Sequence, residues 1–140
     1  MTIPELVNVS PLSITIKWNE LVDMNLNGGD YPIFYQVEYS SNNSTWTALN
    51  ANGALVFQYT HTVTTIFPSG SSQYYRLKAK NNVGLGTVPS PGLAVVADSL
   101  PIGMTTITNG TINPTDITIT WTELSDNTLN GGDLPIFYGV

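Results

Sequence analysis

The stretch that decides the fold is WNELVDMNLNGGDYPIFYQV at residues 18–37, which returns near the end of the chain as WTELSDNTLNGGDLPIFYGV at residues 121–140. The spacing is constant at 103 residues, so that Trp18 recurs as Trp121. The identities include the apolar positions at both ends and the polar segment between them, so a shared composition does not explain them. A repeat of this length means that one structural unit is used again.

Alternating apolar residues predict a β-strand on each side of the polar segment, because a period of two is typical of a half-buried strand. In residues 12–18 the predicted inward side chains are Leu12, Ile14, Ile16 and Trp18, and in residues 33–39 they are Ile33, Tyr35, Val37 and Tyr39. Between the two strands, Asn27-Gly28-Gly29-Asp30 is a turn-forming cluster.

Further short strands follow along the first hundred residues. We expect them around Trp46, in residues 54–67 as one or two strands separated near Gln58, at residues 75–79 and at residues 93–96. No segment of useful length carries the apolar spacing of a helix. Short strands separated by turn signals predict an antiparallel β-sandwich.

Together these residues resemble the fibronectin type III family. The resemblance rests on Trp18 in the second strand, Gly28-Gly29, the pattern Tyr35-x-Val37-x-Tyr39 and RLKAKNNVGLG at residues 76–86. It implies an all-β, fibronectin-type-III-like antiparallel β-sandwich over residues 1–97, a short linker at 98–101, and an incomplete second repeat at 102–140 that holds the first three strands of an identical unit. One departure is Gln73, or Ser72 if the gap falls differently, where the family places its corner tyrosine.

The second repeat, residues 102–140, is expected to expose apolar strand faces, because about 40 residues seldom fold unaided. Two explanations are open: the polypeptide continues, or another chain supplies the missing strands by strand addition. Continuation is favoured, since the first unit has a full set of strands and none to lend.

The composition excludes several classes of partner and site. The chain is 41% apolar and 10% charged, with a net charge of −6, so phosphate backbones and anionic membrane surfaces are disfavoured partners. It has no cysteine, which excludes disulfides, thiolate nucleophiles and cysteine-based zinc sites. No apolar run has the length of a membrane span. Pro4, Glu5 and Asn8 interrupt any signal-peptide core, so a secretion signal would lie outside this chain.

The polar loop raises the question of a metal site. Asp23, Asn25, Asn27 and Asp30 carry oxygen side chains ahead of or beside a glycine pair, which resembles the start of a calcium loop. However, Phe34 stands where the bidentate glutamate belongs, and Thr128 replaces Asn25 in the second repeat. A hydrogen-bonded turn is therefore the preferred interpretation, no cofactor is expected, and Ca²⁺ is the alternative.

Four asparagines begin glycosylation sequons, namely Asn8, Asn42, Asn43 and Asn109. Asn42 and Asn43 lie at a predicted turn tip, where an attached sugar would be solvated, and Asn43 is the better acceptor because threonine stands at its +2 position. We hypothesise N-glycans at these sites if the host is a eukaryote and the chain is secreted.

Phe34 and its counterpart Phe137 are predicted to point away from the core face of their strands. Together with Ile33, they form a candidate contact surface toward a neighbouring domain or chain. If this parity is right, replacing Phe34 by serine weakens assembly and leaves the domain folded.

These observations favour a structural, non-catalytic repeat module of an extracellular or cell-surface fibre, stalk or coat, whose partners are neighbouring copies of the same repeat. His61 is the only histidine, and no nucleophile motif surrounds any serine, so an enzyme is not expected. The alternatives are a ligand- or calcium-binding adhesion module and an accessory spacer of a large secreted protein.

Overall fold

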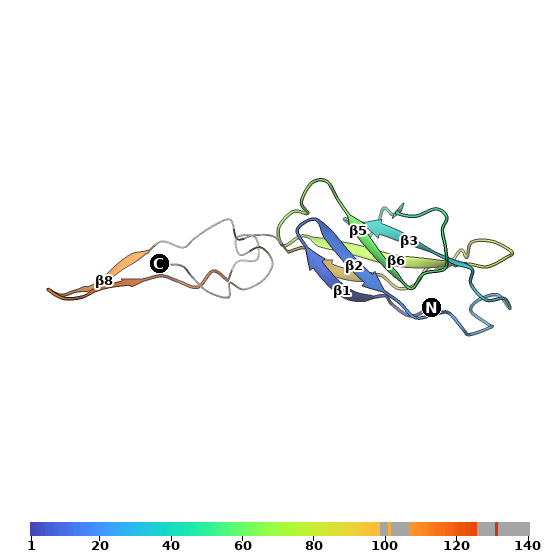
Figure 1. Ribbon diagram of the computed structural model, residues 1–140, viewed down its shortest axis with the longest axis horizontal. Coiled ribbons are helices and arrows are strands. Elements are labelled where there is room, and N and C mark those ends of the chain that lie inside the picture. The colour runs from blue at the N-terminus through green and yellow to red at the C-terminus, as the bar shows by residue number, and fades with distance from the viewer. Residues whose placement is uncertain (99–100, 102–106, 126–130, 132–140) are drawn as a thin grey trace.

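Antiparallel β-strands make up the described structure (Figure 1). The computed structural model describes residues 1–98, 101, 107–125 and 131, and these residues contain nine strands and no helix. The strands are β1 (Glu5–Ser10), β2 (Ser13–Lys17), β3 (Phe34–Ser40), β4 (Thr47–Ala48), β5 (Gln58–Thr62), β6 (Ser72–Lys80), β7 (Leu93–Val96), β8 (Thr108–Ile112) and β9 (Ile117–Thr120). The all-β prediction is confirmed. In the described part of the chain, no helix has the length and apolar character needed to cross a membrane.

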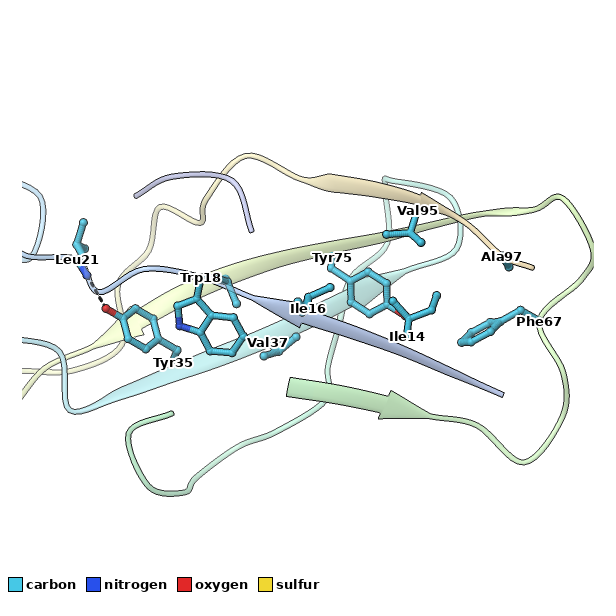
Figure 2. Close-up of a cluster of buried hydrophobic side chains, with 11 residues drawn as sticks. Ile14, Ile16, Trp18, Leu21, Tyr35, Val37, Phe67, Tyr75, Val95 and Ala97 are labelled. Carbon is cyan, nitrogen blue, oxygen red and sulfur yellow. Dashed lines mark hydrogen bonds between the residues drawn. The ribbon is translucent and has the colours of Figure 1, made fainter. Parts of the chain in front are cut away.

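Two sheets enclose one hydrophobic core, with strand orders β1-β2-β5 and β4-β3-β6-β7. Figure 2 shows the core side chains in a row between the strands, with Leu21 and Tyr35 near one end and Phe67 and Ala97 near the other. Burying each large apolar side chain contributes about 1.5–3 kcal/mol to folding. Every residue of this core cluster lies between Ile14 and Ala97. We therefore expect residues 1–97 to fold on their own.

The prediction of which side chains face the core is correct within the strands. It is wrong for the residue that immediately precedes each of the two strands. Ile14, Ile16, Trp18, Tyr35 and Val37 are all buried. In contrast, Leu12 is 44% exposed and Ile33 is 45% exposed. Both precede the first residue of their strand, so the alternation of the strand does not determine which way they point.

The remaining strands differ from the predictions mainly in length. The expected strands at 93–96 and 75–79 appear as β7 and within the longer β6. The strand expected around Trp46 is only the two-residue β4, and residues 54–67 hold the single strand β5, which begins at Gln58. The resemblance implied a first strand ahead of β2 but gave it no bounds; the structure places it at Glu5–Ser10, at the sheet edge, with its first four residues exposed.

The two ends of the sandwich differ in their relation to the chain termini. We call the end formed by residues 21–33 and 81–89 the loop end, and the N-terminus lies there (Figure 1). We call the opposite end the exit end; it comprises the Pro11-Leu12 turn, residues 63–71 and Ala97. There Phe67 N donates to Pro11 O at 3.1 Å and Gly70 N donates to Ala97 O at 3.2 Å. The chain thus enters at the loop end and leaves at the exit end.

The hairpin β8–β9 repeats the hairpin β1–β2 in its strand register. The paired residues are Glu5↔Lys17, Leu6↔Ile16 and Val9↔Ile14 in the first hairpin, and Thr108↔Thr120, Asn109↔Ile119 and Ile112↔Ile117 in the second. Each residue of the second set lies 103 positions after its counterpart. Each hairpin also has an irregularity at the same place, after Leu6 and after Asn109. The sequence repeat is therefore also a repeat of backbone pairing.

The two hairpins differ in burial. Ile117 is 74% exposed and Ile119 is 38% exposed, whereas the matching Ile14 and Ile16 are at most 1% exposed. In the first unit, residues of β3 and β6 cover this face. The third strand expected in the second repeat lies outside the described residues.

Candidate functional site

The first loop of the loop end connects β2 to β3 and is held by a buried phenol. Leu21 N donates to the hydroxyl oxygen of Tyr35 at 2.7 Å (Figure 2). Burial raises the pKa of Tyr35, although this backbone hydrogen bond opposes the rise, so the phenol stays neutral. Further along, Gly28 and Gly29 have φ angles of 77° and 81°, a region that favours glycine.

The second loop connects β6 to β7 and is locked to the first by asparagine side chains. Asn81 Oδ1 accepts hydrogen bonds from the backbone of its own turn, and Asn81 Nδ2 donates to Asn27 O at 2.9 Å. Asn82 Nδ2 donates to Asp30 Oδ2 at 2.8 Å. A Cβ added at Gly28 would lie 3.3 Å from Asn81 Nδ2, so the close approach of the loops also favours glycine there.

Between these loops lies a hollow of about 660 Å³, lined mainly by apolar residues. Large side chains around it remain in solvent: Val83 is 90% exposed, Val88 is 80% exposed and Leu26 is 61% exposed. Val22, Met24 and Leu85 are exposed on the same two loops. The loop end thus gathers many exposed apolar side chains on two interlocked loops, which is typical of a surface that another molecule covers.

The oxygen side chains of the calcium hypothesis mostly serve the loop itself. Asp23 Oδ1 accepts from Asn25 N at 2.9 Å, and Asn27 Oδ1 accepts from Gly29 N at 3.0 Å. Asn27 is buried, and its Nδ2 donates to Leu21 O. Asp30 instead bonds to the second loop. Among residues 1–98, 101, 107–125 and 131, no three His, Cys, Asp or Glu side chains form a group that could hold a metal ion.

The sequon asparagines lie at three different places. Asn8 is exposed on β1, and Asn42 and Asn43 occupy the turn after β3. Asn42 Oδ1 accepts from Ser44 N at 2.9 Å and from Thr45 N at 2.8 Å, so its side chain closes the turn. Asn43 is exposed with a φ of 56°. Asn109 lies in β8. Asn42 and Asn43 are both exposed, and glycosylation stays a prediction at all four sites.

Phe34 does not present the exposed ring that the contact hypothesis needs. It lies on the face of β3 opposite the core, as predicted, yet it is only 5% exposed. The loop after β4 covers it: a Cβ added at Gly53 would lie 3.6 Å from the Phe34 ring. Strand alternation predicts on which face of the sheet Phe34 lies, but it does not predict that a loop covers that face. Ile33 is exposed beside it, and Phe137 lies outside the described residues.

A polar network in the core was missed by sequence reasoning. His61 Nδ1 lies 2.9 Å from the Tyr75 hydroxyl, and burial lowers the pKa of His61 while it raises that of Tyr75. Tyr39 donates its hydroxyl proton to Gln73 Oε1 at 2.6 Å, and Gln73 Nε2 donates to Ser71 Oγ at 2.7 Å. Gln73, at the position of the missing corner tyrosine, thus satisfies its own buried amide. His61 and Tyr75 lie on different strands, as do Tyr39 and Gln73, so no local sequence pattern reveals these two pairs.

On the outer face of the larger sheet, one carboxylate holds two cations. Glu38 Oε2 lies 2.6 Å from Arg76 Nε, and Glu38 Oε1 lies 2.9 Å from Lys78 Nζ. Burial acts to raise the pKa of Glu38, but the hydrogen bonds from Lys78 and Arg76 outweigh it and hold this pKa below its ordinary value. Arg76 also stacks over the Trp46 ring at 4.1 Å. The cluster therefore binds strands to each other on this face.

No family model matches this chain, so we infer the role of the site from its own residues. The loop end offers apolar side chains, backbone groups and asparagine amides to a partner. Such a surface supports binding by packing and hydrogen bonds, as interfaces between proteins do.

Proposed function

We propose that this protein is a structural, non-catalytic repeat module of the fibronectin type III kind, whose units stack end to end in an extracellular fibre, stalk or surface coat. The observation that carries the proposal is the pairing register that β1–β2 and β8–β9 share at a spacing of 103 residues. A seven-stranded antiparallel sandwich with strands β1 to β7 in two sheets supports the family assignment.

The connection between repeats supports stacking. Only residues 98–101 separate Ala97 from the second repeat, and a segment this short restricts the relative motion of two units. In such arrays each unit contacts its nearest neighbours, so the partners are further copies of the same repeat.

An extracellular or cell-surface location fits the surface chemistry. The chain has few charged residues, many hydroxyl and amide side chains, and an exposed sequon asparagine, Asn43, at a turn tip. Sugars attached there would be solvated, because Asn43 is exposed.

Electron microscopy of the native material tests the function. The proposal predicts rods or bundles with an axial period equal to the length of one sandwich. Compact particles without this period, or a catalytic domain that carries a single isolated sandwich, would contradict it and favour the spacer alternative.

A further inference from the structure

Within residues 1–98, four strands lie at the edges of the two sheets, and three of them carry a feature that hinders pairing with another strand. Proteins protect sheet edges with charged residues, prolines, bulges or very short strands, because an edge presents unpaired backbone groups. β1 has Glu5 in an ion pair with Lys17 at 3.4 Å and a break in its register after Leu6. β4 has two residues, and β7 has four and lies beside β1.

The remaining edge strand, β5, has no such protection. It lies beyond β2 at the border of the three-stranded sheet (Figure 1). Its register with β2 is regular from Gln58 to Thr62, and it contains neither proline nor Asp, Glu, Lys or Arg. In the part of the chain that the structure describes, no strand pairs with its outer edge. β5 can therefore accept a further strand without first being rearranged.

The backbone groups that point outward from β5 belong to three residues. Phe57 O accepts from Trp18 N at 3.0 Å, and Val63 N donates to Leu12 O at 2.9 Å. Both ends of the strand thus turn these groups toward β2, and the direction alternates from residue to residue along an antiparallel strand. The residues whose N–H and C=O groups point away from β2 are therefore Gln58, Thr60 and Thr62.

These three residues form a self-complementary edge. If a second β5 lies antiparallel with Thr60 opposite Thr60, Gln58 of each copy lies opposite Thr62 of the other. All the outward N–H and C=O groups are then paired, and the sheet continues from one molecule into the next. The arrangement has a two-fold axis, so the same surface serves both copies and the contact closes on itself.

The side chains around this edge suit a second copy. Residues 39–75 contain no Asp, Glu, Lys or Arg, so no charge on β5 faces its own copy across the two-fold axis. Thr60 Oγ1 lies 2.9 Å from Thr15 Oγ1, and the pairing would extend this row of threonines into the second molecule. Phe57 is 39% exposed and would lie opposite Val63 of the other copy, which adds apolar burial.

We propose that two copies of this unit associate side by side through their β5 edges, antiparallel and with Thr60 opposite Thr60. The contact uses the side of the sandwich and neither of its ends, so it goes beyond the proposed stacking and does not depend on it. An extended peptide from another protein would use the same backbone groups without this two-fold register. The register therefore distinguishes the two occupants.

Thiol cross-linking of the 140-residue chain tests the register, because the chain has no cysteine of its own. Thr60→Cys places two thiols opposite each other, with Cα atoms about 5.5 Å apart in a hydrogen-bonded pair. Dibromobimane, which bridges two neighbouring thiols by displacement of its two bromides, should link this variant into covalent dimers. Gln58→Cys is the matched control: its two thiols would lie about 13 Å apart along the strands, and little dimer should form.

A mixture of Gln58→Cys and Thr62→Cys chains, one of them labelled with ¹⁵N, completes the cross-linking test. The proposed register places residue 58 of one chain opposite residue 62 of the other, so mass spectrometry should show mainly mixed dimers. Failure of Thr60→Cys to link, or equal linking of Thr60→Cys and Gln58→Cys, would overturn the proposal.

Sedimentation velocity then measures the contribution of the edge to association. Thr60→Pro removes an outward N–H and leaves the bonds to β2 intact, so the dissociation constant of the dimer should rise roughly tenfold. Thr60→Lys keeps the N–H but places two like charges opposite each other, and its effect should shrink as salt is added. Unchanged association in both variants would overturn the proposal.

Leu6→Ser serves as the control for these variants, since Leu6 is 44% exposed on β1, at the opposite edge of the same sheet. It should leave the dissociation constant unchanged. Near-ultraviolet circular dichroism checks that every variant is folded. Native rods with the axial period but no linking of Thr60→Cys would refute this contact alone, whereas native material without the period would refute the stacking function.

Discussion

At the scale of single residues, the buried groups that titrate should give the stability a definite pH dependence. His61 lies against the Tyr39, Phe67 and Tyr75 rings, at centroid distances of 4.7, 5.7 and 5.9 Å. Burial holds its folded-state pKa below the ordinary 6.5, so the folded protein keeps the imidazole neutral. The unfolded chain binds the proton more readily, and acidification therefore favours unfolding.

The first prediction is that the free energy of unfolding is constant between pH 8 and pH 7 and falls as the pH drops below about 6.5. Urea unfolding between pH 8 and pH 5 measures it. His61→Gln, which cannot titrate, should remove this dependence. An equal slope in the variant and the unsubstituted protein would show that another group is responsible.

Glu38 gives a second and separate dependence at lower pH. Its side chain is 10% exposed and accepts charge-assisted hydrogen bonds from Arg76 and Lys78. Because its folded pKa lies below the ordinary value, the carboxylate stabilises the fold above pH 4.5, and this contribution is lost as the pH falls through the folded pKa. Glu38→Gln should cost about 1–3 kcal/mol at pH 7. The cost should shrink toward pH 3; a constant difference in urea unfolding would contradict the ion-pair account.

At the scale of elements, the two adjacent glycines of the first loop provide a matched comparison. Gly28 and Gly29 have nearly the same positive φ, but an added Cβ meets Asn81 only at Gly28 and has no atom within 4 Å at Gly29. Gly29→Ala should cost about 1 kcal/mol from backbone strain alone. Gly28→Ala should cost clearly more, about 2 kcal/mol, since it also disturbs the bond from Asn81 to Asn27. Equal losses in thermal unfolding would mean that the loops are not locked together.

The start of strand β3 provides another pair of neighbours with opposite burial: its first residue, Phe34, and Ile33 just before it. Phe34 is 5% exposed beneath the loop after β4, whereas Ile33 is 45% exposed. Phe34→Ser should therefore lower the free energy of unfolding by about 3 kcal/mol or more, and Ile33→Ser by less than about 1 kcal/mol. Chemical unfolding of both variants checks this. A stable Phe34→Ser protein would restore the idea that this ring lies at an external contact.

The strands show what sequence alone could predict. The period-two pattern of Ile14, Ile16 and Trp18 placed β2 and its inward face correctly, because side-chain direction along a strand is local. It could not determine the covering of Phe34, since that depends on the loop after β4, which is distant in the chain. The locking of Asn81 and Asn82 onto the first loop is likewise invisible in the sequence, because it joins two loops distant in the chain. The turn at Gly28 and Gly29 could be predicted from the sequence, because turn formation depends on neighbouring residues.

At the scale of the whole molecule, the main feature is repetition. The paired residues of β1–β2 and β8–β9 occupy equivalent positions of the repeat, so the repeated sequence forms the same strand pairing twice. In the first hairpin the matching face packs into the core beneath β3 and β6. Exposed Ile117 and Ile119 are thus an apolar face that fits a sheet like the one in the first unit.

The most direct test of this repeat account completes the second copy with the first copy's own sequence. Residues 35–97 are joined after Phe137, the counterpart of Phe34, and the exchange of the β9 amides with deuterated water is measured. We predict that a second sandwich folds and that exchange at Ile117 and Ile119 slows to the rates of Ile14 and Ile16. Exchange as fast as in the 140-residue chain would contradict it, since the hairpin would then not be the beginning of the same unit.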